Sequence, residues 1–224
     1  PPFLPSLSWF PQASRCHGRG QPDSRGVLLT DTEPRHSAGI GLETARELAR
    51  KGWHVTLGCR DLERGEQAAA SIRESVGEQA RLEVLRVDLS DLDSVWEFAD
   101  QMRWGRGRLH LLVNNAGIML APFGISKQGV EQTFATNYVG PFVLTQLLLP
   151  ALRRASSREA PARVVMVGSV AHKFPLSERL VMNLPVINNA TLYESMPERW
   201  RWYGHSKKAL NSFVGAVTLL PSLF

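Results

Sequence analysis

Apolar and polar residues alternate along the chain in a regular rhythm that begins at Gly26. Short runs that are almost entirely apolar are followed by longer stretches in which apolar residues recur every three or four positions. The short runs predict strands and the longer stretches predict amphipathic helices. The predicted strands are 26–30, 54–59, 81–89, 109–115 and 162–169, and the predicted helices are 41–52, 62–77, 91–104, 129–155 and 203–220.

This alternation predicts an α/β fold. Strands that are nearly all apolar are buried on both faces, which is typical of a parallel sheet covered by helices on both sides. We therefore expect a doubly wound parallel sheet flanked by helices, with ligands bound at the carboxyl ends of its strands. The helix over 129–155 is expected to be interrupted near Gly140 and Pro141.

The rhythm also predicts the domain organisation. Residues 1–25 are rich in Pro, Gly, Ser and Arg and have no period, so an irregular or disordered segment is expected there. Residues 26–224 are expected to form a single domain, because a chain of 224 residues has room for one sizeable core.

Charge and composition exclude several kinds of partner. The net charge is +5, but Lys and Arg form no dense run, so neither nucleic acid nor a membrane surface is an expected partner. No apolar run reaches the roughly 18 residues of a membrane span. The two cysteines, Cys16 and Cys59, form no metal-ligand pattern with histidines, so no metal site is expected and a reducing compartment fits. The first residues do not resemble a signal peptide, and a protein that is not secreted is expected.

A glycine-rich stretch, "TDTEPRHSAGIGLETA", joins the first predicted strand to the first predicted helix. Such a turn lets the backbone approach a pyrophosphate, which then lies at the helix N-terminus. Gly39, Ile40 and Gly41 fit this role. The usual earlier glycine is absent: Arg35 lies six positions before Gly41, and Asp31 near the strand end would repel a pyrophosphate.

Arg60 follows the second predicted strand, in the sequence "CRD". In a dinucleotide site this position faces the adenosine ribose, where an acid favours a free 2′-hydroxyl and an Arg accommodates a 2′-phosphate. Arg60 therefore favours NADP(H) over NAD(H). An Arg at a helix start that simply faces solvent is the alternative.

Four further motifs follow in order: "LVNNAGIM" (112–119), "FATNYVGPF" (134–142), "RVVMVGSVAH" (163–172) and "YGHSK" (203–207). In order and spacing they resemble the classical short-chain dehydrogenases/reductases, over roughly residues 26 to 214. The branch that contains retinol dehydrogenase-like and WW-domain oxidoreductase-like proteins is the most similar. The resemblance implies a Rossmann-like domain that binds NAD(P).

The resemblance also implies roles for individual residues. Tyr203 matches the catalytic acid/base, Lys207 the lysine one turn on, Ser169 the serine that holds the substrate oxygen and Asn137 the asparagine of the active-site tetrad. The implied cofactor-binding residues are Asp88, Leu89, Asn115, Ala116, Gly117, Tyr203 and Lys207, with Asp88 at the adenine ring.

Elementary chemistry agrees with the spacing of Tyr203 and Lys207. Carbonyl reduction adds a hydride to carbon and a proton to oxygen, and the proton donor must lie within hydrogen-bond reach of that oxygen. A free phenol has a pKa of roughly 10, and a nearby ammonium stabilises the phenolate. Residues four apart share one helix face, so the lysine can serve the tyrosine.

Three functions therefore compete. The first is an NADP(H)-dependent oxidoreductase that acts on a small hydrophobic alcohol or carbonyl such as a retinoid, a steroid or a lipid aldehyde. The second is a truncated, non-catalytic binding or interaction protein with the same fold. The third, an extended relative such as a nucleotide-sugar epimerase, is disfavoured by the N-N-A-G motif and by the short chain.

The end of the sequence departs from the family pattern. After "NSFVGAVTLLPSLF" the family continues with further strands and a substrate loop, which are expected to be missing here. The domain is therefore expected to be incomplete, with poor solubility and weak turnover. The resemblance also implies a possible homodimer through the helices at 129–155 and 203–220.

Overall fold

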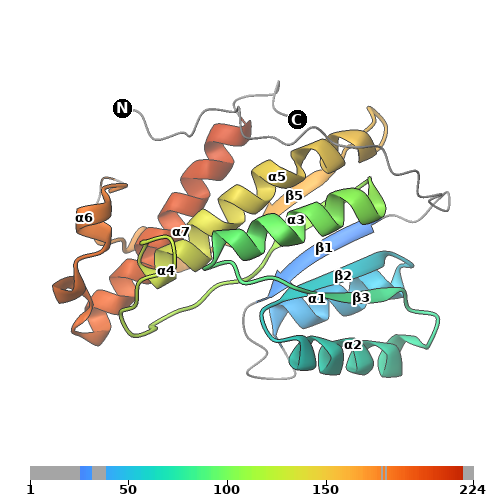
Figure 1. Ribbon diagram of the computed structural model, residues 1–224, viewed down its shortest axis with the longest axis horizontal. Helices are drawn as coiled ribbons and strands as arrows, with labels where there is room; N and C mark the ends of the chain where they lie inside the picture. Colours follow the sequence, from blue (N-terminus) through green and yellow to red (C-terminus); the bar gives the residue numbers. More distant parts are fainter. Residues whose placement is uncertain (1–25, 32–38, 178, 180, 219–224) are drawn as a thin grey trace.

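A computed structural model describes residues 26–31, 39–177, 179 and 181–218 (Figure 1). The strands are β1 (Gly26–Asp31), β2 (His54–Cys59), β3 (Leu82–Arg86), β4 (Leu111–Asn114) and β5 (Arg163–Met166). The longer helices are α1 (Ile40–Arg50), α2 (Leu62–Val76), α3 (Leu92–Arg106), α5 (Gly140–Ala155) and α7 (Met196–Thr218). The short elements are α4 (Gln132–Phe134), the π-helical turn η2 (Ala135–Val139), the 3₁₀ turns η3 (Val170–Lys173) and η4 (Ala190–Tyr193), and α6 (Leu184–Ile187). The expected irregular segment at 1–25 lies outside the described residues.

The five strands form one parallel sheet in the order β3-β2-β1-β4-β5. Helices α1 and α2 cover one face of the sheet, and α3 and α5 cover the other (Figure 1). This arrangement confirms the predicted α/β fold class. The direction of winding reverses between β1 and β4, and the carboxyl ends of those two strands are where a ligand crevice opens in such sheets.

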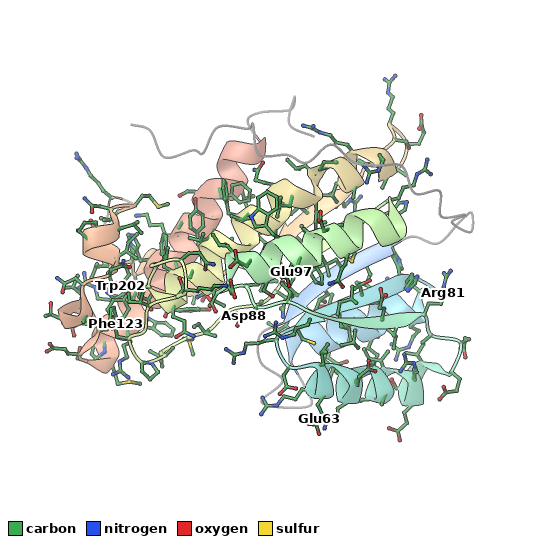
Figure 2. All side chains as sticks on the ribbon, in the orientation of Figure 1. Glu63, Arg81, Asp88, Glu97, Phe123 and Trp202 are labelled. Carbon is green, nitrogen blue, oxygen red and sulfur yellow. The ribbon has the colours of Figure 1, made fainter. Side chains whose placement is uncertain are left out.

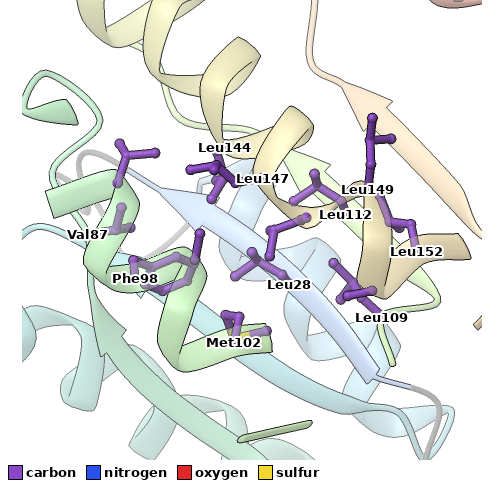
Figure 3. Packing of buried hydrophobic residues seen from close by; sticks show 14 of the residues in the cluster. Leu28, Val87, Phe98, Met102, Leu109, Leu112, Leu144, Leu147, Leu149 and Leu152 are labelled. Atoms are coloured by element: carbon purple, nitrogen blue, oxygen red, sulfur yellow. The ribbon is translucent and has the colours of Figure 1, made fainter. Parts of the chain in front are cut away.

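Side chains of β1 alternate between the two faces, because successive residues of a strand point in opposite directions. Leu28 packs with Phe98 of α3, Leu112 of β4 and Leu144 of α5 (Figure 3). Its neighbours on β1 pack on the opposite face, against α1 and α2. We call the side chains around Leu28, on the α3 and α5 face, the sheet core.

The strands at the two edges of the sheet are shorter and less buried than the sequence predicted. β3 ends at Arg86, so Asp88 and Leu89 lie beyond the strand, and β5 ends three residues before Ser169. The residues of β3 are half-buried or exposed, and Val165 of β5 is 43% exposed. The expectation of burial on both faces is therefore wrong for these two strands, since each has a neighbour on one side only.

The helix predicted over 129–155 begins at Gln132. The interruption expected near Gly140 and Pro141 lies just before them, where η2 makes one π-helical turn, and α5 then runs on from Gly140. A Cβ at Gly140 would lie 2.2 Å from the carbonyl oxygen of Leu89. Gly140 is therefore the residue that lets this helix approach the segment after β3.

Helix α7 begins at Met196, so Tyr203 lies inside the helix and does not open it as predicted. Ser195 and Glu198 form a reciprocal cap: the Ser195 N–H donates to the Glu198 carboxylate at 2.9 Å, and the Glu198 N–H donates to the Ser195 hydroxyl at 3.3 Å. The sequence carries this S-x-x-E pattern, which is typical of a helix start, at residues 195–198.

The first half of α7 packs on a separate hydrophobic cluster, away from the sheet core. Its fully buried members are Phe134, Ile187, Tyr193, Trp202 and Ala209, and we call this set the α7 cluster. The Tyr193 and Trp202 rings stack with centroids 4.9 Å apart, and Phe123 lies 5.2 Å from Tyr193. Figure 2 shows Phe123 and Trp202 together at the end of the molecule beyond the sheet.

Within the described part of the chain, no helix has the length and apolarity needed to cross a membrane.

Candidate active site

Most of the predicted cofactor-binding residues lie beyond the carboxyl ends of strands. Gly39, Ile40 and Gly41 lie at the start of α1, which follows β1 in the chain, and Arg60 follows β2 directly. Asp88 and Leu89 follow β3, and Asn115, Ala116 and Gly117 follow β4. Parallel strands end at the same edge, so these segments share one edge of the sheet.

Lys207 and Asn137 meet at Gly117. A Cβ placed on Gly117 would lie 3.2 Å from the Lys207 Nζ and 3.4 Å from the Asn137 Oδ1. Lys207 and Asn137 are buried, with 3% and 0% of their surface exposed. The loop after β4, the π-helical turn and α7 thus converge on one small polar centre, and any side chain larger than hydrogen at position 117 would crowd it.

Lys207 lies in this centre with one direct hydrogen bond to a backbone oxygen. Its Nζ donates to the Val167 carbonyl at 2.9 Å and lies 5.8 Å from the centroid of the Tyr203 ring. Burial lowers the pKa of Lys207 from 10.5 to about 8, because desolvation disfavours the ammonium. Near neutral pH the lysine still carries a positive charge beside the tyrosine ring.

Asn137 ties the loop after β4 to the rest of the centre. Its Oδ1 accepts from the Ile118 N–H at 2.8 Å, and its Nδ2 donates to the Ile118 carbonyl at 2.9 Å and to the Ser206 hydroxyl at 3.0 Å. The side chain therefore serves the backbone at Ile118 and not the helix near Gly140. Ser206, which the sequence analysis did not single out, is part of the same network.

Ser169 caps the 3₁₀ turn η3, which packs on α7. Its hydroxyl accepts from the Ala171 N–H at 3.2 Å. Gly204, next to Tyr203, makes the packing possible: a Cβ there would lie 2.4 Å from the Ala171 carbonyl oxygen and 2.7 Å from that of Phe174. The turn that carries Ser169 and the helix that carries Tyr203 are thus in backbone contact.

A cavity of about 630 Å³ opens at the carboxyl edge of the sheet. Four of the predicted cofactor-binding residues line it, namely Arg60, Asp88, Leu89 and Gly117, and Figure 2 labels Asp88 at its position near the centre of the molecule. The remaining wall comes from 118–123, Gln132 and Thr136. A cavity of this size is within the usual range for small-molecule sites.

The cavity and the start of α1 fit the parts of a dinucleotide. Gly39 is the N-cap residue of α1 and has no side chain that could cap the helix. A Cβ at this position would have no atom within 4 Å. A bare helix N-terminus suits a phosphate, and Arg60 supplies a cation at the cavity. Asp88 is held in place, since its Oδ1 accepts from the Ser90 N–H at 2.9 Å and the Ser90 hydroxyl at 2.6 Å.

Two buried polar atoms at the switch point have no hydrogen-bond partner among the described residues. They are the hydroxyl of Thr30 at the end of β1 and the Oδ1 of Asn114 at the end of β4, and these two residues are paired in the sheet. The Asn114 amide does donate to the Thr145 hydroxyl at 3.1 Å. The expected repulsion from Asp31 and the absent glycine near Arg35 concern side chains and a loop that lie outside what the structure describes.

Sequence reasoning assigned no role to two buried ionisable residues near the site. Glu131 caps α4 by accepting from the Thr133 and Phe134 N–H groups, both at 2.8 Å, and burial raises its pKa. The Nε2 of His205 lies 2.9 Å from the Val181 carbonyl oxygen, and burial lowers the pKa of His205. Periodicity could not reveal either contact, because each joins segments far apart in the sequence or depends on an irregular turn.

Among the described residues, no three His, Cys, Asp or Glu side chains gather in a way that could hold a metal ion.

The family model described as short chain dehydrogenase matches residues 36–181. Retinol dehydrogenase 12 of Mus musculus is 40% identical over 168 residues, which are 75% of this chain and 50% of that protein. Retinol dehydrogenase 11 of Homo sapiens is 43% identical over 176 residues, 76% of this chain and 52% of that protein. The chain thus spans about half the length of these curated relatives.

Solved structures agree with the fold. The RhlG/NADP active-site complex of Pseudomonas aeruginosa has a TM-score of 0.63 and 29% sequence identity, and the match covers 89% of this chain and 67% of that one. An uncharacterised protein from Mycobacterium paratuberculosis has a TM-score of 0.62 and 35% identity, covering 87% of this chain and 64% of that one.

Proposed function

Because the chain belongs to the short-chain dehydrogenase family, we propose that it is an oxidoreductase that interconverts an alcohol and a carbonyl on a small hydrophobic substrate with NADP(H). One observation carries this proposal. Lys207, Asn137 and Gly117 converge in a buried centre, with the Tyr203 ring beside the lysine and the Ser169 turn packed on the same helix. Retinol dehydrogenases among the relatives support an apolar substrate.

In this proposal each residue has one task. The nicotinamide, when bound, supplies or accepts the hydride. The Tyr203 hydroxyl donates a proton to the carbonyl oxygen in reduction and removes it in oxidation. The Lys207 ammonium stabilises the phenolate that forms, and the Ser169 hydroxyl donates a hydrogen bond to the substrate oxygen. Asn137 ties the Ile118 backbone to Ser206 of α7, the residue before Lys207, and so positions the lysine.

Asn137 has one more capacity. Both hydrogens of its amide are used, but its Oδ1 accepts a single hydrogen bond in the described structure and has a second lone pair. That lone pair can accept a water molecule, which would return protons from solvent to Lys207. We propose this role in addition to the positioning role.

The cofactor is proposed to be NADP(H), with Arg60 at the 2′-phosphate. Arg60 is exposed, follows β2 and lines the cavity with Asp88. An Arg at this place matches a phosphate better than a ribose hydroxyl. The NADP complex of RhlG, a structural neighbour, is consistent with this choice.

The first test is reduction of all-trans-retinal and nonanal by the purified protein with NADPH, with Tyr203→Phe as the variant. Loss of the proton donor should lower kcat roughly a hundredfold to ten-thousandfold. NADPH binding, followed by quenching of Trp fluorescence, should change far less than kcat, because the aromatic ring beside Lys207 is kept. A folded wild type that binds no cofactor would overturn the proposal and would favour a non-catalytic binding protein.

The cofactor choice has its own test. Arg60→Ala should weaken NADPH binding by roughly tenfold to a hundredfold, because a charge-assisted hydrogen bond is lost. NADH binding should change little, since it lacks the 2′-phosphate. Equal losses for both cofactors would mean that Arg60 supports the cavity without recognising the phosphate.

We also propose that the protein forms a homodimer through α5 and α7. The Phe142 and Phe213 rings join these helices in an edge-to-face contact with centroids 4.9 Å apart, and Val214 is 39% exposed beyond it. A concentration-dependent dimer by light scattering, weakened by Val214→Asp, is the expected result.

A further inference from the structure

A second cleft lies beside the active site, between the segment 173–177 and α7. Its volume is about 450 Å³, and it is lined by Lys173, Phe174, Pro175, Leu176, Ser177, Trp200 and Arg201. We propose that this cleft binds the far end of the substrate and selects an anionic group there, so that the favoured carbonyl substrates are apolar aldehydes that end in a carboxylate. This proposal rests on the function proposed above.

The cleft is directly connected to the catalytic helix. Trp200 lies one turn before Tyr203 on α7, and their ring centroids are 5.9 Å apart. The opposite wall begins four residues after Ser169, and the carbonyl oxygen of Phe174 lies against Gly204. A substrate whose carbonyl reaches Tyr203 therefore has this cleft as a neighbouring space for its other end.

The walls of the cleft are mostly apolar and suit an alkyl chain. Phe174 is 58% exposed, although a ring of this size is usually buried, and the Trp200 ring is partly exposed beside it. Pro175 and Leu176 complete the apolar wall. Burying such rings against an alkyl chain would remove apolar surface from water, which favours binding.

The described charged side chains of the cleft are all positive. Of the described residues that line it, only Lys173 and Arg201 are charged, and both are exposed. One Arg201 N–H group donates to the Leu176 carbonyl at 2.8 Å, which holds the guanidinium at the wall and leaves its other N–H groups for a ligand. No described residue forms an ion pair with Lys173 in this structure.

One acidic residue on α7 acts on Arg201. Glu198 lies one turn before it, and the pKa of Glu198 is lowered, first by the hydrogen bonds from Ser195 and to a smaller degree by the charge of Arg201. The Glu198 carboxylate is thus engaged at the start of α7 and is not part of the cleft. The described residues of the lining therefore carry a net positive charge, and a carboxylate is the matching ligand group.

The test compares two aldehydes of the same chain length, nonanal and azelaic semialdehyde, which ends in a carboxylate. With NADPH, we expect kcat/KM to be about tenfold or more higher for azelaic semialdehyde, and this preference to shrink as salt is raised. The double variant Lys173→Gln/Arg201→Gln should bring the two values close together. It should lower the value for nonanal much less than the value for azelaic semialdehyde, because nonanal uses only the apolar walls.

A control variant removes the same charge elsewhere. Arg50 and Lys51 lie at the end of α1, on the face of the sheet opposite α3 and α5. The variant Lys51→Gln/Arg50→Gln should keep the preference for azelaic semialdehyde. Equal kcat/KM for the two aldehydes in the wild type would overturn the proposed subsite while leaving the proposed reaction intact. An equal loss of kcat/KM for both aldehydes in the double variant would also overturn the proposed subsite.

If neither aldehyde is reduced, the proposed reaction fails and the cleft is tested by binding alone. Isothermal titration calorimetry with azelate should then show saturable binding to the wild type and to the control variant. Binding should be lost in Lys173→Gln/Arg201→Gln. The absence of saturable azelate binding to a folded wild type would overturn the subsite.

Discussion

The sheet core and the α7 cluster solve different problems with different side chains. The sheet core around Leu28 is mainly aliphatic. The α7 cluster is mainly aromatic, and buried Glu131 and His205 lie against it: the Phe134 N–H donates to Glu131, and the His205 ring is 5.4 Å from that of Trp202. The sheet core defines the edge where the candidate cofactor site lies, and the α7 cluster holds the helix with the proposed catalytic residues.

Apolar packing and hydrogen bonds position residues with different precision. Aliphatic packing places whole elements, since its energy is roughly proportional to buried area and has no direction. Hydrogen bonds have direction, and those of Asn137 and Lys207 fix the position and orientation of each of these side chains. Substitutions in the sheet core should therefore change global stability, whereas substitutions near α7 should change the site first.

The largest effect is expected for Leu28→Ala. Leu28 is fully buried, and the substitution removes apolar contacts and leaves a cavity between α3 and α5. The free energy of unfolding should fall by about 2–5 kcal/mol, measured by urea denaturation. NADPH affinity of the protein that remains folded should be unchanged. A loss of well under 1 kcal/mol would mean that the sheet core does not carry the stability of the fold.

The next effect is a pH dependence due to Lys207. Its folded pKa, about 8, is below the ordinary 10.5, so the unfolded chain binds more protons between these two values. Stability contributed by this group should therefore rise as pH increases through that window, by up to roughly 3 kcal/mol. The measurement is the difference in unfolding free energy between wild type and Lys207→Met across that pH range, in which the contributions of groups distant from Lys207 cancel. Parallel curves would contradict a desolvated lysine.

Gly204→Ala tests the backbone contact beside Tyr203. A methyl group there meets the carbonyl oxygens of Ala171 and Phe174 and must push η3 away from α7. We expect the free energy of unfolding to fall by about 1–3 kcal/mol. We expect kcat to fall by a larger fraction than the free energy of unfolding, because the Ser169 turn moves relative to Tyr203. The matched control is Gly215→Ala on the same helix, where a Cβ has nothing within 4 Å. It should be neutral or stabilise by up to about 1 kcal/mol.

The two regions also differ in how far the sequence predicts them. Alternation and period were sufficient for β1, β2 and the helices packed on them, because burial in the sheet core follows from sequence spacing alone. The interruption near Gly140 was predicted, but its π-helical form and the contact of Asn137 with Ile118 were not, since they depend on tertiary hydrogen bonds. The start of α7 was placed seven residues too late, although Ser195 and Glu198 carried a readable capping signal.

The smallest effect concerns two threonines on either side of the switch point. The Thr145 hydroxyl donates to the Pro141 carbonyl at 2.7 Å and accepts from Asn114, so Thr145→Val should cost about 1–2 kcal/mol. The Thr30 hydroxyl is buried with no partner among the described residues, so Thr30→Val, of nearly the same shape, should change the free energy of unfolding by less than about 0.5 kcal/mol. Denaturation without cofactor measures both.

The same pair separates structure from ligand binding at the switch point. If the Thr30 hydroxyl serves a bound dinucleotide, Thr30→Val should leave the stability of the free protein intact and weaken NADPH binding by about tenfold, as expected for one lost hydrogen bond. Thr145→Val should show the opposite order, with a loss of stability and little change in affinity. A Thr30→Val variant that loses as much stability as Thr145→Val would show that the hydroxyl has a structural partner. The carboxyl end of β1 would then be held in place by directed hydrogen bonds, as the site near α7 is, and not by apolar packing alone.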